Sequence, residues 1–233
     1  MPPPLPAWLS TLWPSQCLLC RRWPAQPLCC DCQARFASPA PRCRSCALPL
    51  TADNTVGRCG ACVRQPPPLS QCVVAVDYGY PWSRLLTQWK YGAQPALSHH
   101  LAQWLQTNAH GQALRAQSRV SIPIPPSAQR LRTRGYHHSL LLARALDAPG
   151  LLPHGLQRLH HTAAQAGQGR AARLRNLRGA FAVPDAARER IAGQTVLLVD
   201  DVITTGATLH MAALALLQAG AASVSAVALA RTP

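Results

Sequence analysis

The residues whose types and spacing best suit ligand chemistry lie near the C-terminus, in residues 196–208. An apolar segment at 195–199 lacks polar alternation, which predicts a buried parallel strand. Two neighbouring carboxylates, Asp200 and Asp201, follow it directly. Ligands of open α/β sheets bind beyond the carboxyl ends of parallel strands. At that position, adjacent carboxylates suit two vicinal hydroxyl groups of a sugar.

Small and hydroxyl-bearing residues come next and predict a turn that leads into a helix. These residues are Thr204, Thr205, Gly206, Ala207 and Thr208. Free backbone amides, hydroxyl groups and the positive end of the helix dipole together favour phosphate binding. One strand–turn–helix corner would therefore hold a ribose and its 5′-phosphate. A magnesium site or two helix-capping aspartates are the alternatives for the acid pair alone.

Cysteines are the second group of candidate ligands, since nine of the ten lie before residue 63. Eight of them form four CxxC pairs, at Cys17/Cys20, Cys29/Cys32, Cys43/Cys46 and Cys59/Cys62. This density is typical of thiolate metal knuckles, so we expect two structural zinc ions with four cysteine ligands each. A disulfide framework is the alternative, and it requires an oxidising compartment. The spacing does not decide which pairs share an ion or whether Cys30 replaces a neighbour, and it leaves Cys72 spare.

Composition excludes some classes of protein. The 233 residues are 48% hydrophobic, which excludes a disordered chain, and no apolar run reaches the roughly 18 residues of a membrane span. The first residues lack the pattern of a secretion signal, so we expect a cytoplasmic protein. The formal net charge is +15, and arginine supplies all of the basic residues except Lys90. This balance favours a partner that carries phosphates, either a small molecule or a nucleic acid.

A proline-rich stretch and the periodicity of apolar residues indicate how the chain is organised. Three prolines at 66–68 mark a stiff linker. We predict a double zinc ribbon over 1–65, the linker over 66–70, and a larger domain over 71–233. In that domain we expect strands at 73–78, 120–124, 195–199 and 224–229, an arginine-rich turn after 124, and helices around 82–89, 97–105, 140–142 and 209–217. Alternating strands and helices predict a parallel sheet with helices on both faces.

The 196–208 segment resembles the phosphoribosyl-pyrophosphate (PRPP) motif of the type I phosphoribosyltransferases. Together with the four CxxC pairs, the chain resembles the ComF family of competence-associated and DNA-utilization proteins along nearly its whole length. The shared motifs are Leu28-Cys29-x-x-Cys32, Cys43-x-x-Cys46-Ala47-Leu48-Pro49-Leu50, Cys59-Gly60-x-Cys62, Trp89-Lys90-Tyr91, Ile122-Pro123-Ile124-Pro125, Arg130-Leu131-Arg132-x-Arg134-Gly135-Tyr136, Thr162-x-x-Gln165, Arg173-x-x-Asn176-x-x-Gly179-Ala180-Phe181 and Ala230-Arg231-Thr232. The family commonly reads Arg-Gly-Phe-Asn-Gln where this chain has two histidines, His137 and His138.

The resemblance implies a type I phosphoribosyltransferase-like domain after a small zinc ribbon. It implies that Asp200 and Asp201 take the ribose hydroxyls and that the residues from Thr204 to Thr208 take the 5′-phosphate. The turn that carries Arg130, Arg134 and Gly135 would face the pyrophosphate, and Mg²⁺ would bridge ribose and pyrophosphate.

Two classes of function are therefore expected. The first is a phosphoribosyltransferase, a glycosyltransferase that transfers a pentosyl group from Mg²⁺-bound PRPP to an unidentified acceptor, with a role in competence, DNA uptake or DNA utilization. The second is a non-catalytic module of the same fold that binds single-stranded DNA or a helicase or recombination partner. Proteins of the DNA-uptake machinery are further candidate partners. The sequence identifies no catalytic base.

Overall fold

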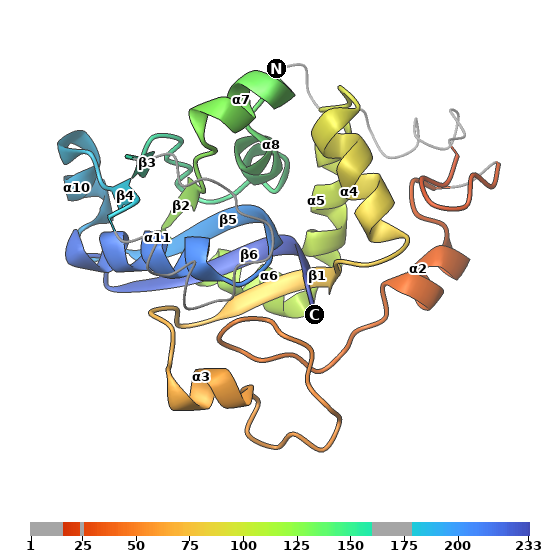
Figure 1. The fold of residues 1–233 in the computed structure, drawn as a ribbon, viewed down its shortest axis with the longest axis horizontal. Helices are drawn as coiled ribbons and strands as arrows, with labels where there is room; N and C mark the ends of the chain where they lie inside the picture. The colour runs from red at the N-terminus through yellow and green to blue at the C-terminus, as the bar shows by residue number, and fades with distance from the viewer. Residues whose placement is uncertain (1–15, 24–25, 160–178) are drawn as a thin grey trace.

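Four parallel strands form the central sheet, in the order β1-β6-β5-β2 (Figure 1). The structure is a computed structural model and describes residues 16–23, 26–159 and 179–233. The strands are β1 (Cys72–Asp77), β2 (Val120–Pro123), β5 (Thr195–Ile203) and β6 (Ser223–Arg231). The two central strands, β5 and β6, are the longest, and the segment predicted to bind the ligand begins in β5.

Helices cover both faces of this sheet, which confirms the predicted fold class. On one face, Leu197 and Val199 pack with apolar side chains of α4, α5 and α8. On the other, Val196 and Leu198 pack with α10 and α11. These helices are α4 (Trp82–Tyr91), α5 (Leu97–Thr107), α8 (His138–Ala145), α10 (Asp185–Ile191) and α11 (Ala207–Gln218). Because both faces of β5 are buried, its sequence is apolar without alternation.

Strand β5 is longer than predicted, and this moves the acid pair. The expected strand ends at Val199, where the apolar run ends, whereas the observed strand continues through Asp200 and Asp201 to Ile203. Parallel pairing with β6 explains the extension, since Asp200 is opposite Ala228. Both carboxylates therefore belong to the last part of a strand whose backbone is fixed by its neighbour, rather than to a loop.

The arginine-rich turn predicted after residue 124 is a helix, α7 (Ala128–Arg134). Its start is capped by the Ser127 hydroxyl, which accepts from the Arg130 amide, and it ends at Gly135. Gly135 adopts φ +78°, a left-handed conformation that glycine provides without steric cost. With one large apolar residue, Leu131, this segment lacks the periodicity that predicts a helix.

Further elements that the sequence did not predict complete the larger unit. They are helix α6 (Ala109–Gln117), the helix α10 given above, and a short antiparallel pair of strands, β3 (Gln157–Arg158) and β4 (Phe181–Ala182). The Thr162–Gln165 motif and most of the Arg173–Phe181 motif lie outside the described residues. Across the part of the chain that is described, we find no helix with the length and apolarity needed to cross a bilayer.

The cysteine-rich segment holds two short helices, α2 (Cys30–Phe36) and α3 (Gly60–Arg64), at the periphery of the sheet (Figure 1). It contacts the larger unit at Phe36 and at Arg44. The Trp82 indole N–H donates to the Phe36 carbonyl at 2.7 Å, and the Cys72 amide donates to the Arg44 carbonyl at 2.7 Å. The division into a ribbon, a linker at 66–70 and a larger domain stays a prediction.

Candidate functional site

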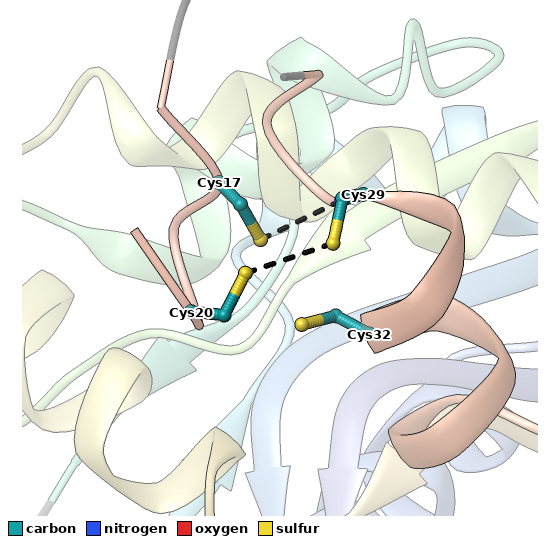
Figure 2. Close-up of side chains that lie close together, drawn as sticks. All are labelled: Cys17, Cys20, Cys29 and Cys32. Carbon is teal, nitrogen blue, oxygen red and sulfur yellow. Dashed lines mark hydrogen bonds between the residues drawn. The ribbon is translucent and has the colours of Figure 1, made fainter. Parts of the chain in front are cut away.

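The first four predicted metal ligands form one cluster, here called the first tetrad: Cys17, Cys20, Cys29 and Cys32. Figure 2 shows two of these side chains coming from a loop and two from the start of α2, with their sulfurs turned toward one another. The Sγ atoms of Cys20 and Cys29 are 3.7 Å apart. Four sulfurs around zinc at about 2.3 Å lie about 3.8 Å from each other, whereas a disulfide needs about 2.05 Å. The spacing therefore fits a metal centre.

The second tetrad has the same form and consists of Cys43, Cys46, Cys59 and Cys62. The Sγ atoms of Cys46 and Cys59 are 3.8 Å apart. In each tetrad the two CxxC pairs are consecutive in the sequence. The structure therefore shows which pairs would share an ion, which the spacing alone did not decide. Cys30 is exposed and Cys72 is buried in β1, and neither belongs to a tetrad. Either tetrad could hold a zinc ion in a closed, four-coordinate site.

Backbone amides prepare one thiol in each tetrad for metal binding. Burial alone raises the pKa of Cys17, but the Cys29 amide, 3.5 Å from its sulfur, and neighbouring amides outweigh burial and lower that pKa to about 6. In the second tetrad, burial likewise raises the pKa of Cys43, and amides that include that of Cys59 lower it to about 7. Since the thiolate is the metal ligand, donation by these amides favours the ligand form.

Asp200 is buried at the carboxyl end of β5 and makes only neutral hydrogen bonds among those resolved. Its Oδ1 accepts from the Ser139 hydroxyl of α8 at 3.3 Å and from the Asp201 amide at 2.9 Å. Burial, and then the neighbouring carboxylate of Asp201, raise the pKa of Asp200 to about 7. Near neutral pH both the protonated and the ionised forms of this carboxyl group are therefore populated. It offers oxygen atoms for a hydroxyl group of a ligand.

Asp201 differs from its neighbour because two cations hold it. The Lys90 ammonium lies 2.9 Å from its Oδ2, and a guanidinium nitrogen of Arg134 lies 3.7 Å from the same oxygen. Burial raises the pKa of Asp201, but the charges of Lys90 and Arg134 outweigh burial, so the pKa is below its ordinary value. The sequence did not identify Lys90 as a site residue. Lys90 and Asp201 are 111 positions apart in the sequence. The only indication for Lys90 was its place in the Trp89-Lys90-Tyr91 motif.

The predicted phosphate-binding residues form a turn between β5 and α11. Gly206 precedes the helix as its N-cap and has the left-handed conformation, with φ +76° and ψ 0°. A β-carbon there would meet only Ile203 Cγ2, at 4.0 Å, so the backbone conformation rather than space requires glycine. Gly206 has no side chain that could cap the helix. The Thr205 hydroxyl accepts from the Ala207 amide at 3.4 Å. Helix α11 has 12 residues, and its first backbone amides and the positive end of its dipole lie at this turn.

Helix α7 places one of the predicted pyrophosphate-side residues, Arg134, beside the acid pair, and Gly135 ends this helix. Arg134 contacts Asp201, as above, and donates to the Tyr91 hydroxyl at 3.0 Å, whereas Arg130 is exposed. A further arginine that the sequence did not single out, Arg158 of β3, donates to the Pro125 carbonyl at 3.1 Å. Burial, and next the charge of Arg130, lower the pKa of Arg158. Cations therefore gather on this side of the carboxylates.

Comparison with known proteins agrees with this architecture. A family model described as Phosphoribosyl transferase domain matches residues 156–233, which include the acid pair and the turn. The DNA utilization protein YhgH of Escherichia coli (strain K12) is 30% identical over 232 residues, covering 94% of this chain and 98% of that protein. The chain belongs to the ComF family.

Other ComF-family relatives are similar over shorter stretches. Competence protein F of Haemophilus influenzae is 32% identical over 190 residues, covering 78% of this chain and 81% of that protein. Competence protein ComFC of Bacillus subtilis is 40% identical over 114 residues, covering 48% of this chain and 45% of that protein. Among solved structures, the allosteric regulatory enzyme of purine biosynthesis matches 61% of this chain with 30% of its own, at 20% identity and a TM-score of 0.39.

The structure explains one departure from the ComF-family pattern. His137 stands where the family commonly has Asn, and its Nδ1 accepts from the Leu140 amide at 3.1 Å, which caps the start of α8. Asn is among the best residues at this position because its side-chain oxygen accepts the same kind of hydrogen bond. His138 lies against the Trp89 ring, with ring centroids 4.7 Å apart. The two histidines therefore have structural contacts of their own.

Proposed function

We propose that this ComF-family protein binds Mg²⁺-bound PRPP at the carboxyl end of β5. The observation that carries the proposal is the corner itself. A buried carboxyl group, Asp200, and the left-handed turn at Gly206 lie within one strand–turn–helix unit of a domain that matches the phosphoribosyltransferase model. Such a corner offers acceptors for hydroxyl groups and amides for a phosphate within the reach of one ribose 5-phosphate.

In this proposal, each predicted residue has one role. Asp200 and Asp201 accept hydrogen bonds from the ribose hydroxyls, and the turn from Thr204 to Thr208 binds the 5′-phosphate. The C-terminal part of α7, with Arg130, Arg134 and Gly135, faces the pyrophosphate. Mg²⁺ enters with the ligand, whose phosphate and hydroxyl oxygens are the hard donors it prefers.

The corresponding reaction is transfer of the phosphoribosyl group to an acceptor, with pyrophosphate as the leaving group. The bond between the anomeric carbon and the pyrophosphate oxygen breaks, and the nucleophile of the acceptor takes its place. The contribution of the protein is to neutralise the charge that develops on the leaving group, which Arg134 and its neighbours are placed to do. The acceptor is a metabolite or a nucleic-acid component used in competence or DNA utilization, the roles that the names of the relatives state.

We further propose that each tetrad holds one structural Zn²⁺, which stabilises a segment with few large apolar residues. The described residues fit this ion, because the S–S distances of 3.7 and 3.8 Å match a tetrahedral site. A cytoplasmic location, as the sequence predicts, would keep these thiols reduced.

Calorimetric titration with Mg²⁺-bound PRPP tests the proposed site. The double variant Asp200→Asn, Asp201→Asn should lose binding, because amides replace the acceptor oxygens and the charge that organises the site. Asp185→Asn, at a side chain that is 98% exposed on α10, is the control for the loss of one carboxylate and should bind as the wild type does. Unchanged affinity in a folded double variant would refute the site. Release of labelled pyrophosphate in the presence of fractions of a metabolite extract then tests transfer and leads to the acceptor.

A second candidate, a non-catalytic module that binds single-stranded DNA, is favoured by the net charge of +15 and by two cation–aromatic pairs, one of which includes the exposed Tyr91. Arg134 lies 5.0 Å from the Tyr91 ring centroid, and Arg35 lies 5.1 Å from that of Phe36. Bases stack on such aromatic side chains, and arginines neutralise the backbone. Affinity for an oligonucleotide should then fall steeply with salt concentration, and a flat response would exclude this mode.

A further inference from the structure

Lys90 is the only lysine of the chain, and its largely covered side chain brings the ammonium group to the acid pair. It lies in the last turn of α4, and its side chain is 13% exposed. The other cation of this helix, Arg84, is exposed. Taking an ammonium group out of water is costly unless opposite charge compensates it. Asp201, at 2.9 Å, supplies that charge in the ligand-free structure.

The backbone around Lys90 is held in place by the segment that follows α7. The carbonyl of Trp89 accepts from the Tyr136 hydroxyl at 2.5 Å, and the His138 Nε2 lies 3.3 Å from the same oxygen. Trp89 itself is fully buried, and its indole N–H donates to the Ser98 hydroxyl at 3.0 Å. The position of Lys90 is therefore fixed by several contacts, unlike that of a lysine in an ordinary surface ion pair.

Positive charge exceeds negative charge around Asp201, which favours an anionic ligand. Lys90 and Arg134 both face one carboxylate oxygen of Asp201, while Asp200 makes neutral hydrogen bonds. Two cations therefore share one ionised carboxylate. A polyanion that approached from the α4 and α7 side would meet two donors already held close together, which is the arrangement that binds phosphate oxygens.

The two ends of a PRPP molecule would occupy different sides of the acid pair. The turn proposed for the 5′-phosphate leads into α11, which packs on the sheet face opposite to that of α4. Lys90 and Arg134 come from α4 and α7 and contact Asp201 from the other side. The group that reaches them is therefore the diphosphate on the anomeric carbon rather than the 5′-phosphate.

From this placement we propose that Lys90 is a binding residue for the diphosphate of the ligand, and that Asp201 holds its ammonium group in position until the ligand arrives. The inference rests on the proposed function, since it names the part of that site that takes the diphosphate. On binding, phosphate oxygens accept hydrogen bonds from Lys90 and Arg134, and the Asp201 carboxylate is freed toward the ribose hydroxyls. A purely structural ion pair would instead affect stability and leave the ligand preferences unchanged.

The first test compares ligands that carry or lack the diphosphate, by calorimetry. Lys90→Met should weaken binding of Mg²⁺-bound PRPP and of Mg²⁺-bound inorganic pyrophosphate by about tenfold or more. Ribose 5-phosphate, which lacks the diphosphate, should bind Lys90→Met as tightly as it binds the wild type. Lys90→Arg should keep most of the affinity because it keeps the charge. Arg84→Met, on an exposed position of the same helix, removes the same charge and should change none of the three affinities.

The second test uses the fact that the chain has one lysine. Protein grown with lysine labelled at its side-chain carbon next to the amine gives a single lysine signal by NMR, and this signal needs no assignment. Mg²⁺-bound pyrophosphate should shift that signal in the wild type with the concentration dependence measured by calorimetry. A signal that stays in place at saturation overturns the proposal.

The outcomes separate this inference from the proposed function. If PRPP binds the wild type but Lys90→Met binds it equally well, Lys90 is structural and the proposed function stands. If pyrophosphate binds through Lys90 but PRPP does not bind, the diphosphate site stands and the proposed function falls. If neither ligand binds the folded wild-type protein, both are overturned.

Discussion

The Arg231 guanidinium donates from Nε to the carbonyl oxygen of Cys46, at 3.1 Å. Arg231 ends β6 and is 8% exposed, while Cys46 belongs to the second tetrad. One terminal nitrogen of the same guanidinium donates to the carbonyls of Ile203 and Thr204, where the proposed phosphate-binding turn begins. A single buried side chain therefore joins a candidate metal centre to the candidate ligand site, although their residues are far apart in the sequence.

This connection predicts that the second tetrad, and not the first, influences the phosphate-binding turn. Cys62→Ser should weaken metal binding in the second tetrad and loosen the Cys46 carbonyl that Arg231 holds. Hydrogen exchange of the amides in residues 203–208 should then be faster than in the wild type, because local opening of the turn requires less free energy. Mass spectrometry of peptides from this segment measures the effect without any ligand.

Cys32→Ser, in the first tetrad, is the matched control, since the Arg231 hydrogen bond reaches Cys46 of the second tetrad. It should leave exchange in residues 203–208 at the wild-type rate. Equal acceleration by both substitutions would mean that metal loss acts through general destabilisation, and the proposed connection would be wrong.

A second prediction concerns the pH dependence of stability at Asp200. Its pKa is about 7 in the folded protein and has an ordinary value of 3.8, so the folded state keeps a proton that the unfolded state releases. The free energy of unfolding should therefore fall as pH rises from about 4 to about 7, by up to about 1.4 kcal/mol per pH unit. Asp200→Asn does not titrate, so its stability relative to the wild type should increase across this window.

Urea unfolding at several pH values between 5 and 8 measures that difference. Asp185→Asn, at an exposed carboxylate, should give a curve parallel to that of the wild type. A constant difference between Asp200→Asn and the wild type over the whole range would show that the Asp200 carboxyl group titrates normally.

The sequence predicted the parts of this site that are local and missed those that are made by distant segments. The corner from Asp200 to Thr208 could be predicted because an apolar strand, two acids and small residues follow each other directly. The extension of β5 could not, because it depends on pairing with β6 rather than on hydrophobicity. Lys90 and Arg231 were also missed as site residues, since a single basic residue in a sequence does not show which carboxylate or carbonyl it will meet.

In the cysteine-rich segment, too, local features could be predicted and long-range contacts could not. Four CxxC pairs predicted two tetrads from ligand chemistry alone, and the structure brings both together. Which CxxC pairs come together depends on how the loops between them fold, and the spacing of the cysteines does not determine this. The contacts that fix the segment to the larger unit, such as that between Trp82 and Phe36, join residues 46 positions apart and leave no local signal.

A third prediction follows from that contact. Phe36 ends α2, the helix that carries Cys29 at its start and Cys32 in its first turn, and the Trp82 indole donates to its carbonyl at 2.7 Å. Trp82→Phe removes this hydrogen bond, which is worth about 1 kcal/mol of stability, and the smaller ring adds the cost of a cavity at this buried position beside Trp104. It should also speed zinc release from the first tetrad, measured with a coloured chelator, and leave release from the second unchanged. Trp23→Phe, at a residue that is 57% exposed, is the control and should alter neither rate.

The fourth prediction concerns the histidine that caps α8. His137→Ala removes the acceptor for the Leu140 amide and should cost about 1 kcal/mol, whereas His137→Asn restores an acceptor and should match the wild type at pH 7. Burial, as the largest effect, lowers the pKa of His137 from 6.5 to about 4. The unfolded state therefore gains a proton before the folded state does, and stability is lost as pH falls from about 6.5 to about 4.

Asn does not titrate in that range, so His137→Asn should become more stable than the wild type at pH 5 while equal to it at pH 7. Urea unfolding at the two pH values measures the difference, and His110→Asn, at an exposed histidine of α6, should track the wild type at both. Equal stability of His137→Asn and wild type at pH 5 would mean that His137 is protonated in the folded state. In that case its Nδ1 could not accept from the Leu140 amide, because both ring nitrogens of a charged imidazole are donors.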